Sequence, residues 1–265
     1  MADPASGYIR LAREGPVGTL LIDRAERSNA WLFQMWGEAT DAIAQADSDP
    51  DVRVILIRSS SESVFSGGAD LDQLAEMTSA DDAGARVDAH LAAVEAFLSS
   101  LENSPKLVVA VIDGAAVGAG LEVACACDLR VASDRARFGI PAARHGIVIA
   151  RPDVARLARV VGWAFASELL LTARTIESEE AMRRGLVSNL VSTGALDSAV
   201  DQLVKRAAGL SPGSIAEMKR HLQDIWPSHT GDDQGFATSR DALLSPELRS
   251  ALAGRPRTES IRRDP

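Results

Sequence analysis

The spacing of hydrophobic residues changes along the chain, and each spacing predicts a different element. Residues 8–14 and 18–23 read as two strands that follow one another across a short turn containing glycine and proline. Residues 29–46 place apolar side chains three and four positions apart, which predicts an amphipathic helix. Ser28 and Asn29 stand at the start of this helix and are expected to be its N-caps, since both side chains can accept a hydrogen bond from a free backbone N–H.

Two further segments are apolar at almost every position. Residues 52–60 (VRVILIRSS) and 106–114 (KLVVAVIDG) are rich in β-branched side chains, and each is preceded by a helical segment. A strand that is apolar on both faces must be covered on both faces, as in the mostly parallel sheets of α/β proteins. The pattern therefore predicts an α/β fold.

Helical spacing dominates after residue 150, with one short strand expected at 185–192. Glycine, serine and proline at 209–212 mark the favoured junction, which predicts an α/β core of residues 1–208 and a C-terminal helical region with a polar tail, residues 209–265. Such a helical region is a candidate for contacts between subunits. The expected helices span 153–162, 163–174, 178–185, 197–209, 214–225 and 247–254.

The two cysteines and several aromatic residues are better explained as core residues than as catalytic or metal-binding residues. Cys125 and Cys127 have no histidine or further cysteine at metal-binding spacing, so they are expected to be small buried side chains. The aromatic residues recur at spacings that helix packing explains. Those expected in the core are Trp31, Phe33, Trp36, Trp163, Phe165 and Trp226.

Composition narrows the functional classes. The chain has 265 residues, 46% of them hydrophobic, so a full core can form. Its formal net charge is −9. Binding to nucleic acid or to an anionic membrane needs clustered Lys and Arg and is therefore not expected. No apolar run approaches the roughly 20 residues of a membrane span. The polar start MADPASG lacks the features of a signal peptide, so we expect a cytoplasmic protein.

Glu122 is the residue whose position most needs an explanation. It lies between a glycine-rich turn and a stretch that reads as buried helix, in VGAGLEVACACD (117–128). Burying a carboxylate without a partner costs several kcal/mol or raises its pKa. The alternative is a solvated glutamate in a first helical turn, where acids are favoured by roughly 0.3–1 kcal/mol.

Glycine-rich turns join a strand to a helix at two places, 64–74 (VFSGGADLDQL) and 112–124 (IDGAAVGAGLEVA). Each would direct free N–H groups of a first helical turn beyond the end of its strand, and two such turns side by side would form an oxyanion hole. A phosphate-binding loop is the competing interpretation. It fails because Val123 stands where the dinucleotide fingerprint needs its last glycine and because no Walker lysine follows either turn.

Five segments together resemble the enoyl-CoA hydratase/isomerase (crotonase) superfamily, over residues 8–256. The resemblance implies a spiral of ββα units, a C-terminal helical region that assembles trimers or dimers of trimers, and an acyl-CoA thioester as ligand. Coenzyme A would be part of the substrate, with no separate cofactor and no metal. The segments are LIDRAERSNA, FSGGADLDQL, DGAAVGAGLEVACACDLRVAS, ARFGIPAARHGI and SRDALLSPELRSAL.

The resemblance also implies roles for individual residues. The backbone N–H groups of Ala69 and Ala119 match the two oxyanion donors that stabilise the enolate of the thioester. Glu122 matches the first of two glutamates with which hydratases of the family move protons. Asp70 is expected to hold its own loop through N–H groups. The residues implied to contact coenzyme A are Ala69, Asp70, Leu71 and Asp72, with Arg24 and Arg27 near its phosphates.

The chain departs from the family at the second glutamate. The family's Pro-Glu falls on Pro141 and Ala142, so one acid/base is missing and efficient hydration is in doubt. His145 and Asp153 are candidate substitutes, and Ile149 with Ala142 would shape the acyl end of the site. Three interpretations stay open: an enoyl-CoA hydratase, an isomerase that needs only one base, and an acyl-CoA-binding homologue without turnover.

Overall fold

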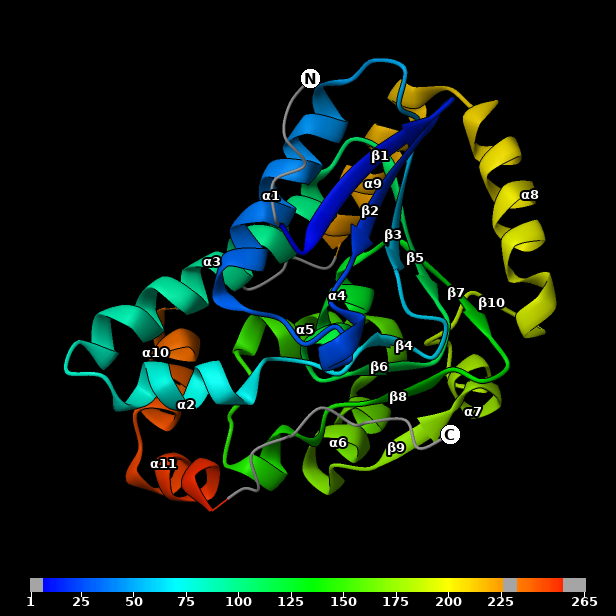
Figure 1. The fold of residues 1–265 in the computed structure, drawn as a ribbon. Coiled ribbons are helices and arrows are strands. Elements are labelled where there is room, and N and C mark those ends of the chain that lie inside the picture. Colours follow the sequence, from blue (N-terminus) through cyan, green and yellow to red (C-terminus); the bar gives the residue numbers. More distant parts are fainter. Residues whose placement is uncertain (1–6, 226–232, 255–265) are drawn as a thin grey trace.

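A six-stranded sheet organises the computed structural model, which describes residues 7–225 and 233–254 (Figure 1). The strand order is β1-β2-β3-β5-β7-β10, with β1 and β2 antiparallel and the other neighbouring pairs parallel. The predicted α/β fold is therefore confirmed. The strands are β1 (Ile9–Glu14), β2 (Val17–Ile22), β3 (Val54–Ser59), β5 (Leu107–Ile112), β7 (Leu129–Ser133) and β10 (Asn189–Val191).

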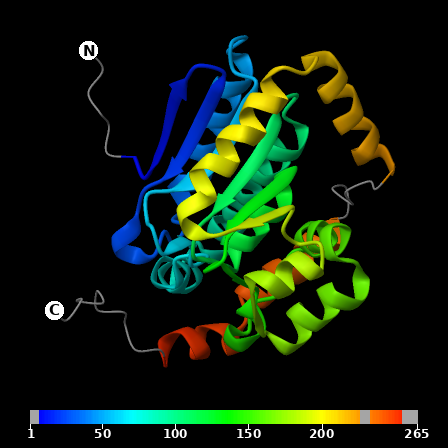
Figure 2. The same cartoon turned by 90° about the vertical axis from the view of Figure 1, so that its right-hand side faces the viewer.

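Helices cover both faces of this sheet, as Figures 1 and 2 show. In β3, Ile55 and Ile57 pack into the cluster that contains the apolar faces of α1 and α3. The alternate residues Val54 and Leu56 pack with α8 on the opposite face. The segment 52–60 is apolar almost throughout because both faces of its strand are covered. These helices span Phe33–Ser48 (α1), Ala83–Asn103 (α3) and Leu196–Ala208 (α8).

A second, smaller sheet lies beside the first and carries the two glycine-rich turns. Its order is β4-β6-β8-β9, and its first three strands are parallel. Each strand has three residues, too few for a period to be recognised in the sequence. The strands are β4 (Val64–Ser66), β6 (Ala115–Val117), β8 (Arg137–Gly139) and β9 (Thr175–Glu177), and α4 (Ala119–Ala126) follows β6.

The described residues after 209 are mostly helical, as expected, and they pack onto the core at two places. Lys219 of α9 is buried, and its Nζ donates to the carbonyls of Leu101 and Lys106 and pairs with Asp128 at 2.8 Å. Helices α10 and α11 pack against α2 through a cluster that includes Leu248. The expected polar tail beyond residue 254 lies outside the described residues. The remaining helices are α2 (Leu71–Ser79), α5 (Arg151–Val161), α6 (Trp163–Thr172), α7 (Ser178–Arg183), α9 (Pro212–Ile225), α10 (Asp233–Leu243) and α11 (Pro246–Ala253).

The expected N-caps of α1 were wrong. The helix begins at Phe33 and is preceded by Leu32. Ser28 and Asn29 instead adopt positive φ angles of 54° and 52° in the turn before the helix. The Asn29 side chain accepts from the N–H of Arg24 at 2.7 Å and donates to strand residues, so it closes this turn instead of capping the helix.

Some aromatic residues expected in the core lie at the surface. Trp31 and Trp36 are each 1% exposed and stack on one another, and Phe165 is 4% exposed, as predicted. Trp163 is 78% exposed and Phe33 is 40% exposed, so the prediction for these two was wrong. Trp226 lies outside the described residues. Helical spacing identifies a face but not whether a neighbouring element covers it. Cys125 and Cys127 are buried and form no disulfide, as expected.

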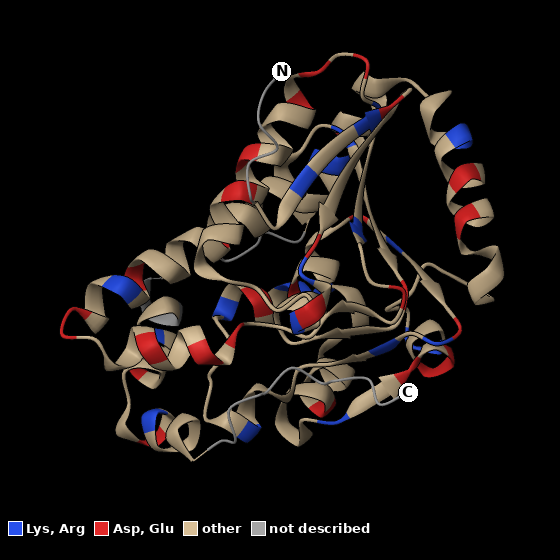
Figure 3. Cartoon of the chain, in the orientation of Figure 1, with Lys and Arg blue, Asp and Glu red and all other residues tan. Residues whose placement is uncertain are grey.

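Charged residues are distributed over the surface elements without a basic stripe in the described part of the chain. Figure 3 shows Lys and Arg interspersed with Asp and Glu along the helices. Among the described residues, no helix is both long and apolar enough to cross a lipid bilayer.

Candidate active site

Two glycine-rich turns meet at the carboxyl ends of the neighbouring parallel strands β4 and β6. Gly68 and Gly118 have φ angles of +104° and +54°, which residues with a side chain rarely adopt. A Cβ atom on Gly68 would lie 3.1 Å from the carbonyl oxygen of Val117 and 3.5 Å from the backbone nitrogen of Ala119. Glycine is therefore what allows the two turns to approach so closely.

The N–H groups that follow these glycines are free. Ala69 and Ala119 donate to no backbone or side-chain acceptor within residues 7–225 and 233–254, although their neighbours Asp70 and Gly118 both donate to backbone carbonyls. Ala119 is the first residue of α4, where an N–H has no partner within the helix. Both alanines line the same cavity. An oxygen placed between them could accept two hydrogen bonds, which is the geometry of an oxyanion hole.

The cavity has a volume of about 160 Å³ and mostly apolar walls. Eight of the residues implicated by the sequence line it: Ala69, Leu71, Ala119, Glu122, Ala142, His145, Ile149 and Asp153. Leu74 of α2 lines it as well. Other walls come from elements that the sequence did not connect with the site, namely Trp36 of α1, His90 and Val94 of α3 and Leu243 of α10. The N-terminal helices and the C-terminal helical region thus meet at one site.

Glu122 lies in the first turn of α4 with its carboxyl group at the cavity wall, and it is only 8% exposed. The interpretation as a solvated glutamate is therefore wrong. Within the described ranges its side chain makes no hydrogen bond and no ion pair. Burial raises the pKa of Glu122 well above the usual carboxyl range, and the nearby carboxyl group of Asp153 raises it further. A carboxyl group in this state can donate or accept a proton near neutral pH.

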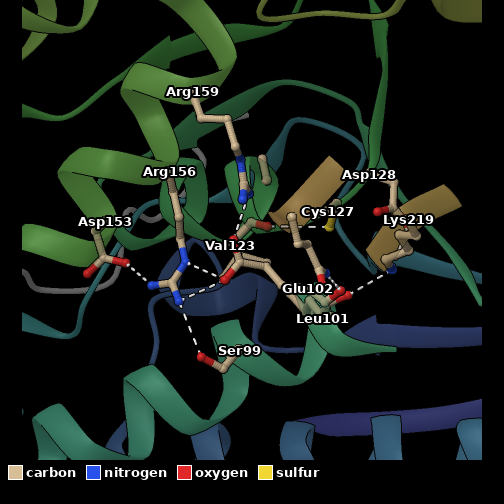
Figure 4. A network of polar contacts seen from close by, with 12 residues as sticks. Ser99, Leu101, Glu102, Val123, Cys127, Asp128, Asp153, Arg156, Arg159 and Lys219 are labelled. Carbon is tan, nitrogen blue, oxygen red and sulfur yellow. Dashed lines mark hydrogen bonds and ion pairs between the residues drawn. The ribbon is translucent and has the colours of Figure 1, made fainter. Parts of the chain in front are cut away.

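Asp153 of α5 reaches the same cavity and is 5% exposed. Its Oδ1 accepts a hydrogen bond from Nη1 of Arg156 at 2.8 Å, as Figure 4 shows. Arg156 is 1% exposed and also pairs with Glu95 at 2.7 Å and Glu102 at 3.0 Å, both on α3. Burial raises the pKa of Asp153, while the guanidinium opposes that rise. Two carboxyl groups from neighbouring helices therefore line one cavity.

The short 3-10 helix Pro141–His145 supplies another part of the wall. Ala142 lies here, so this wall has no carboxyl group at the position where the sequence comparison expected one. His145 also lines the cavity. His90 was not anticipated: burial lowers its pKa to about 4, and its ring packs near Phe33 and Trp36. The only signal in the sequence was a lone histidine on a long helix.

The polar residues expected to contact coenzyme A lie beside the cavity and not in its wall. Asp70 holds its loop, as predicted, because its Oδ1 accepts from the backbone N–H groups of Asp72 and Gln73, both at 3.0 Å. Its Oδ2 pairs at 2.7 Å with Arg24, which is buried. Arg27 is partly exposed and pairs with Asp72 at 2.5 Å. Together these residues fix the turn that carries Ala69.

Among the described residues, no group of three or more His, Cys, Asp or Glu side chains could hold a metal ion. The chemistry that the arrangement itself can perform is proton transfer by carboxyl groups next to two oriented N–H donors.

Comparisons with known proteins identify the family of the chain. The family model for enoyl-CoA hydratase/isomerase matches residues 12–235. A probable enoyl-CoA hydratase of Mycobacterium leprae is 36% identical over 204 residues, which cover 77% of this chain and 73% of the relative. A short-chain-enoyl-CoA hydratase of Clostridium acetobutylicum is 31% identical over 212 residues, covering 80% and 79%. A crystal structure of an enoyl-CoA hydratase/carnitine racemase from Magnetospirillum magneticum superimposes with a TM-score of 0.80 at 28% identity, covering 94% of this chain and 92% of that one.

Proposed function

The chain belongs to the enoyl-CoA hydratase/isomerase family, and from that premise we propose that it converts an acyl-CoA thioester through an enolate. One observation carries the proposal: Ala69 and Ala119, whose N–H groups have no acceptor among the described residues, line the same cavity as the buried Glu122. A thioester oxygen that accepts both hydrogen bonds becomes easier to convert to an enolate. In comparable sites, loss of one donor raises the barrier by roughly 3–4 kcal/mol.

Glu122 is the acid/base of this proposal. Its raised pKa keeps a proton on the carboxyl group over much of the neutral range, while the ionised form, once present, is a stronger base than an ordinary carboxylate. Coenzyme A enters as part of the substrate. Its contacts are proposed at Ala69, Asp70, Leu71 and Asp72, with Arg27 next to them, since Arg24 is buried and bonded inside the fold.

Hydration of an enoyl-CoA is the leading reaction, because the relatives described above are hydratases. Double-bond isomerisation is the second candidate, and the alanine at position 142 favours it. Isomerisation needs one group that removes a proton at one carbon and returns it at another, which Glu122 alone can do. A third possibility, an acyl-CoA-binding homologue without turnover, predicts thioester binding without proton exchange.

Mass spectrometry of enoyl- and acyl-CoA thioesters incubated with the protein in deuterated water separates these reactions. A mass gain of one water indicates hydration, and deuterium at the γ-carbon of an enoyl-CoA indicates isomerisation. Either result must disappear in Glu122→Gln. Tight binding of a thioester without water addition or deuterium exchange would refute catalysis and leave a binding protein.

A homotrimer or a dimer of trimers, and a cytoplasmic location, remain part of this proposal. Exposed apolar side chains on α9, Met218 and Leu222 at 57% and 68% exposure, support an oligomer because such a face is costly to leave in water. Sedimentation equilibrium measures the mass directly, and a monodisperse monomer would refute the oligomer.

A further inference from the structure

The cavity is bordered by two carboxyl groups that come from different helices. Glu122 projects from the first turn of α4, and Asp153 projects from the first turn of α5. Both are almost completely buried apart from the cavity, with exposures of 8% and 5%. Asp153 lies close enough for its negative charge to raise the pKa of Glu122, which burial raises most.

Asp153 is held in place from one side only. Oδ1 accepts from Arg156 at 2.8 Å, whereas Oδ2 makes no hydrogen bond within the described part of the chain. Arg156 is in turn fixed by two glutamates of α3. Nη1, which also donates to Asp153, lies 2.9 Å from Glu95, and Nη2 lies 2.7 Å from Glu95. Nε lies 3.0 Å from Glu102, a contact drawn in Figure 4. A carboxylate anchored through one oxygen keeps the other for a ligand or a water.

The charges around the two groups are unequal. Arg156 and Arg159 are the cations of this network, and Arg159 bonds Glu102 at 2.6 Å. Against these two guanidinium groups stand Glu95, Glu102 and Asp153, and Glu122 would add a further negative charge. Full ionisation would bury uncompensated charge, so a proton must remain. The guanidinium contact favours the ionised form of Asp153, and the proton is left on Glu122.

We propose that Asp153 is the second catalytic carboxylate, which accepts a proton from the attacking water while Glu122 supplies the proton to the α-carbon. This inference rests on the proposed function. It assigns the role of the second acid/base to a residue of α5, because position 142 is an alanine and has no carboxyl group.

The protons and electrons of this step balance. One O–H bond of water breaks, its proton moves to Asp153, and the oxygen bonds to the β-carbon. The electron pair of the Cα=Cβ bond forms a new double bond between Cα and the thioester carbon, and the π pair of the carbonyl moves to its oxygen, where the N–H groups of Ala69 and Ala119 stabilise the enolate. The carbonyl re-forms as the α-carbon takes the proton of Glu122. Transfer of the proton from Asp153 back to Glu122 restores both groups, so no oxidant or further reactant is required.

The pH dependence of this step also involves the other charged groups near the pair. From α3 these are Glu95 and Glu102, and from α5 they are Arg156 and Arg159. Cys125 of α4 is a buried thiol whose pKa burial raises to about 12, so it stays neutral. The histidines at the cavity wall are His90 and His145.

Asp153→Asn tests the assignment, and Glu95→Gln is its matched control. Both variants remove one carboxylate from Arg156, but only Asp153 lines the cavity. Hydration of a short trans-2-enoyl-CoA is followed by the loss of its conjugated absorbance. Exchange of the α-protons of the corresponding saturated acyl-CoA in deuterated water reports Glu122 alone. We expect Asp153→Asn to lose hydration by about 10²- to 10⁴-fold while exchange stays within tenfold, and Glu95→Gln to keep both.

A pH profile of the wild-type protein provides a test that does not depend on the stability of any variant. With increasing pH, the rate of hydration should rise as Asp153 ionises and then fall as Glu122 loses its proton. The rate of α-proton exchange should only rise, because the ionised form of Glu122 is the base. Adding Ala142→Glu to Asp153→Asn should restore hydration.

The possible outcomes separate this inference from the proposed function. The role of Asp153 is overturned if Asp153→Asn leaves the rate of hydration unchanged. It is also overturned if Asp153→Asn and Glu95→Gln lose hydration and exchange equally. In both cases the proposed function stands. If the wild-type protein exchanges α-protons but hydrates no enoyl-CoA, the role of Asp153 in hydration is overturned and isomerisation is favoured. If the wild-type protein shows neither reaction, the proposed function fails and this inference fails with it.

Discussion

Replacing Glu122 with glutamine should abolish the reaction without damaging the fold. Glutamine has the same shape and cannot exchange a proton. Within the described residues the Glu122 side chain makes no hydrogen bond that the change would break. Burial and Asp153 raise the pKa of Glu122, so near pH 7 the protonated glutamic acid and the glutamine are both largely uncharged.

The expected loss follows from the role of a positioned acid or base. Such a group contributes about 10²- to 10⁴-fold in rate, which corresponds to roughly 3–5 kcal/mol of barrier. The effect on stability has the opposite sign. Because the folded state binds this proton more tightly than the unfolded state, wild-type stability decreases as the pH rises from the unfolded carboxyl pKa of about 4.3 through the raised folded pKa. Glutamine removes this decrease, so the variant should be the more stable protein at alkaline pH.

Two assays measure these effects on the same samples. Deuterium incorporation and water addition give the turnover, and urea unfolding at a series of pH values gives the stability. Binding of a saturated acyl-CoA, followed by calorimetry, should remain within a few-fold of wild type. Turnover within tenfold of wild type would refute the assignment of Glu122. A stability difference that does not change with pH would refute the raised pKa.

Three further expectations concern the turn, a buried ion pair and the base. Gly68→Ala should lower turnover at least tenfold by separating the two turns, whereas Gly15→Ala, also at positive φ but in open space, should change only the melting temperature. Arg24→Met removes the 2.7 Å ion pair of the buried Asp70, whose carboxylate then keeps only Arg27 at 3.8 Å and two backbone N–H donors, and should cost about 3 kcal/mol in urea unfolding. The same change at Arg13, whose side chain is 48% exposed, should cost below about 1 kcal/mol, and equal losses would contradict the burial argument. Exchange of α-protons should rise with pH to a midpoint above the normal carboxyl range because ionised Glu122 is the base; a midpoint near 4 would exclude it.

Local sequence patterns predicted much of the fold and part of the candidate site. The apolar runs at 52–60 and 106–114 identified buried strands because residues covered on both faces leave a continuous signature. Two glycine turns after strands pointed to free N–H groups, since a first helical turn always leaves its donors unpaired. A carboxylate within a buried helix pointed to Glu122. Each of these inferences depends only on neighbours within a few positions along the chain.

Tertiary structure decided which distant residues complete the site. Arg156 meets glutamates that precede it by 61 and 54 positions, and nothing in the spacing of α3 or α5 predicts that these helices place their charges together. The same holds for His90 and Leu243, which reach the cavity from separate helices, and for Trp163, which helical spacing alone placed in the core. Periodicity specifies which face of an element is apolar or charged. What that face meets depends on the packing of the whole chain, and that packing turned Asp153 from a residue in a first helical turn into a second carboxylate beside Glu122.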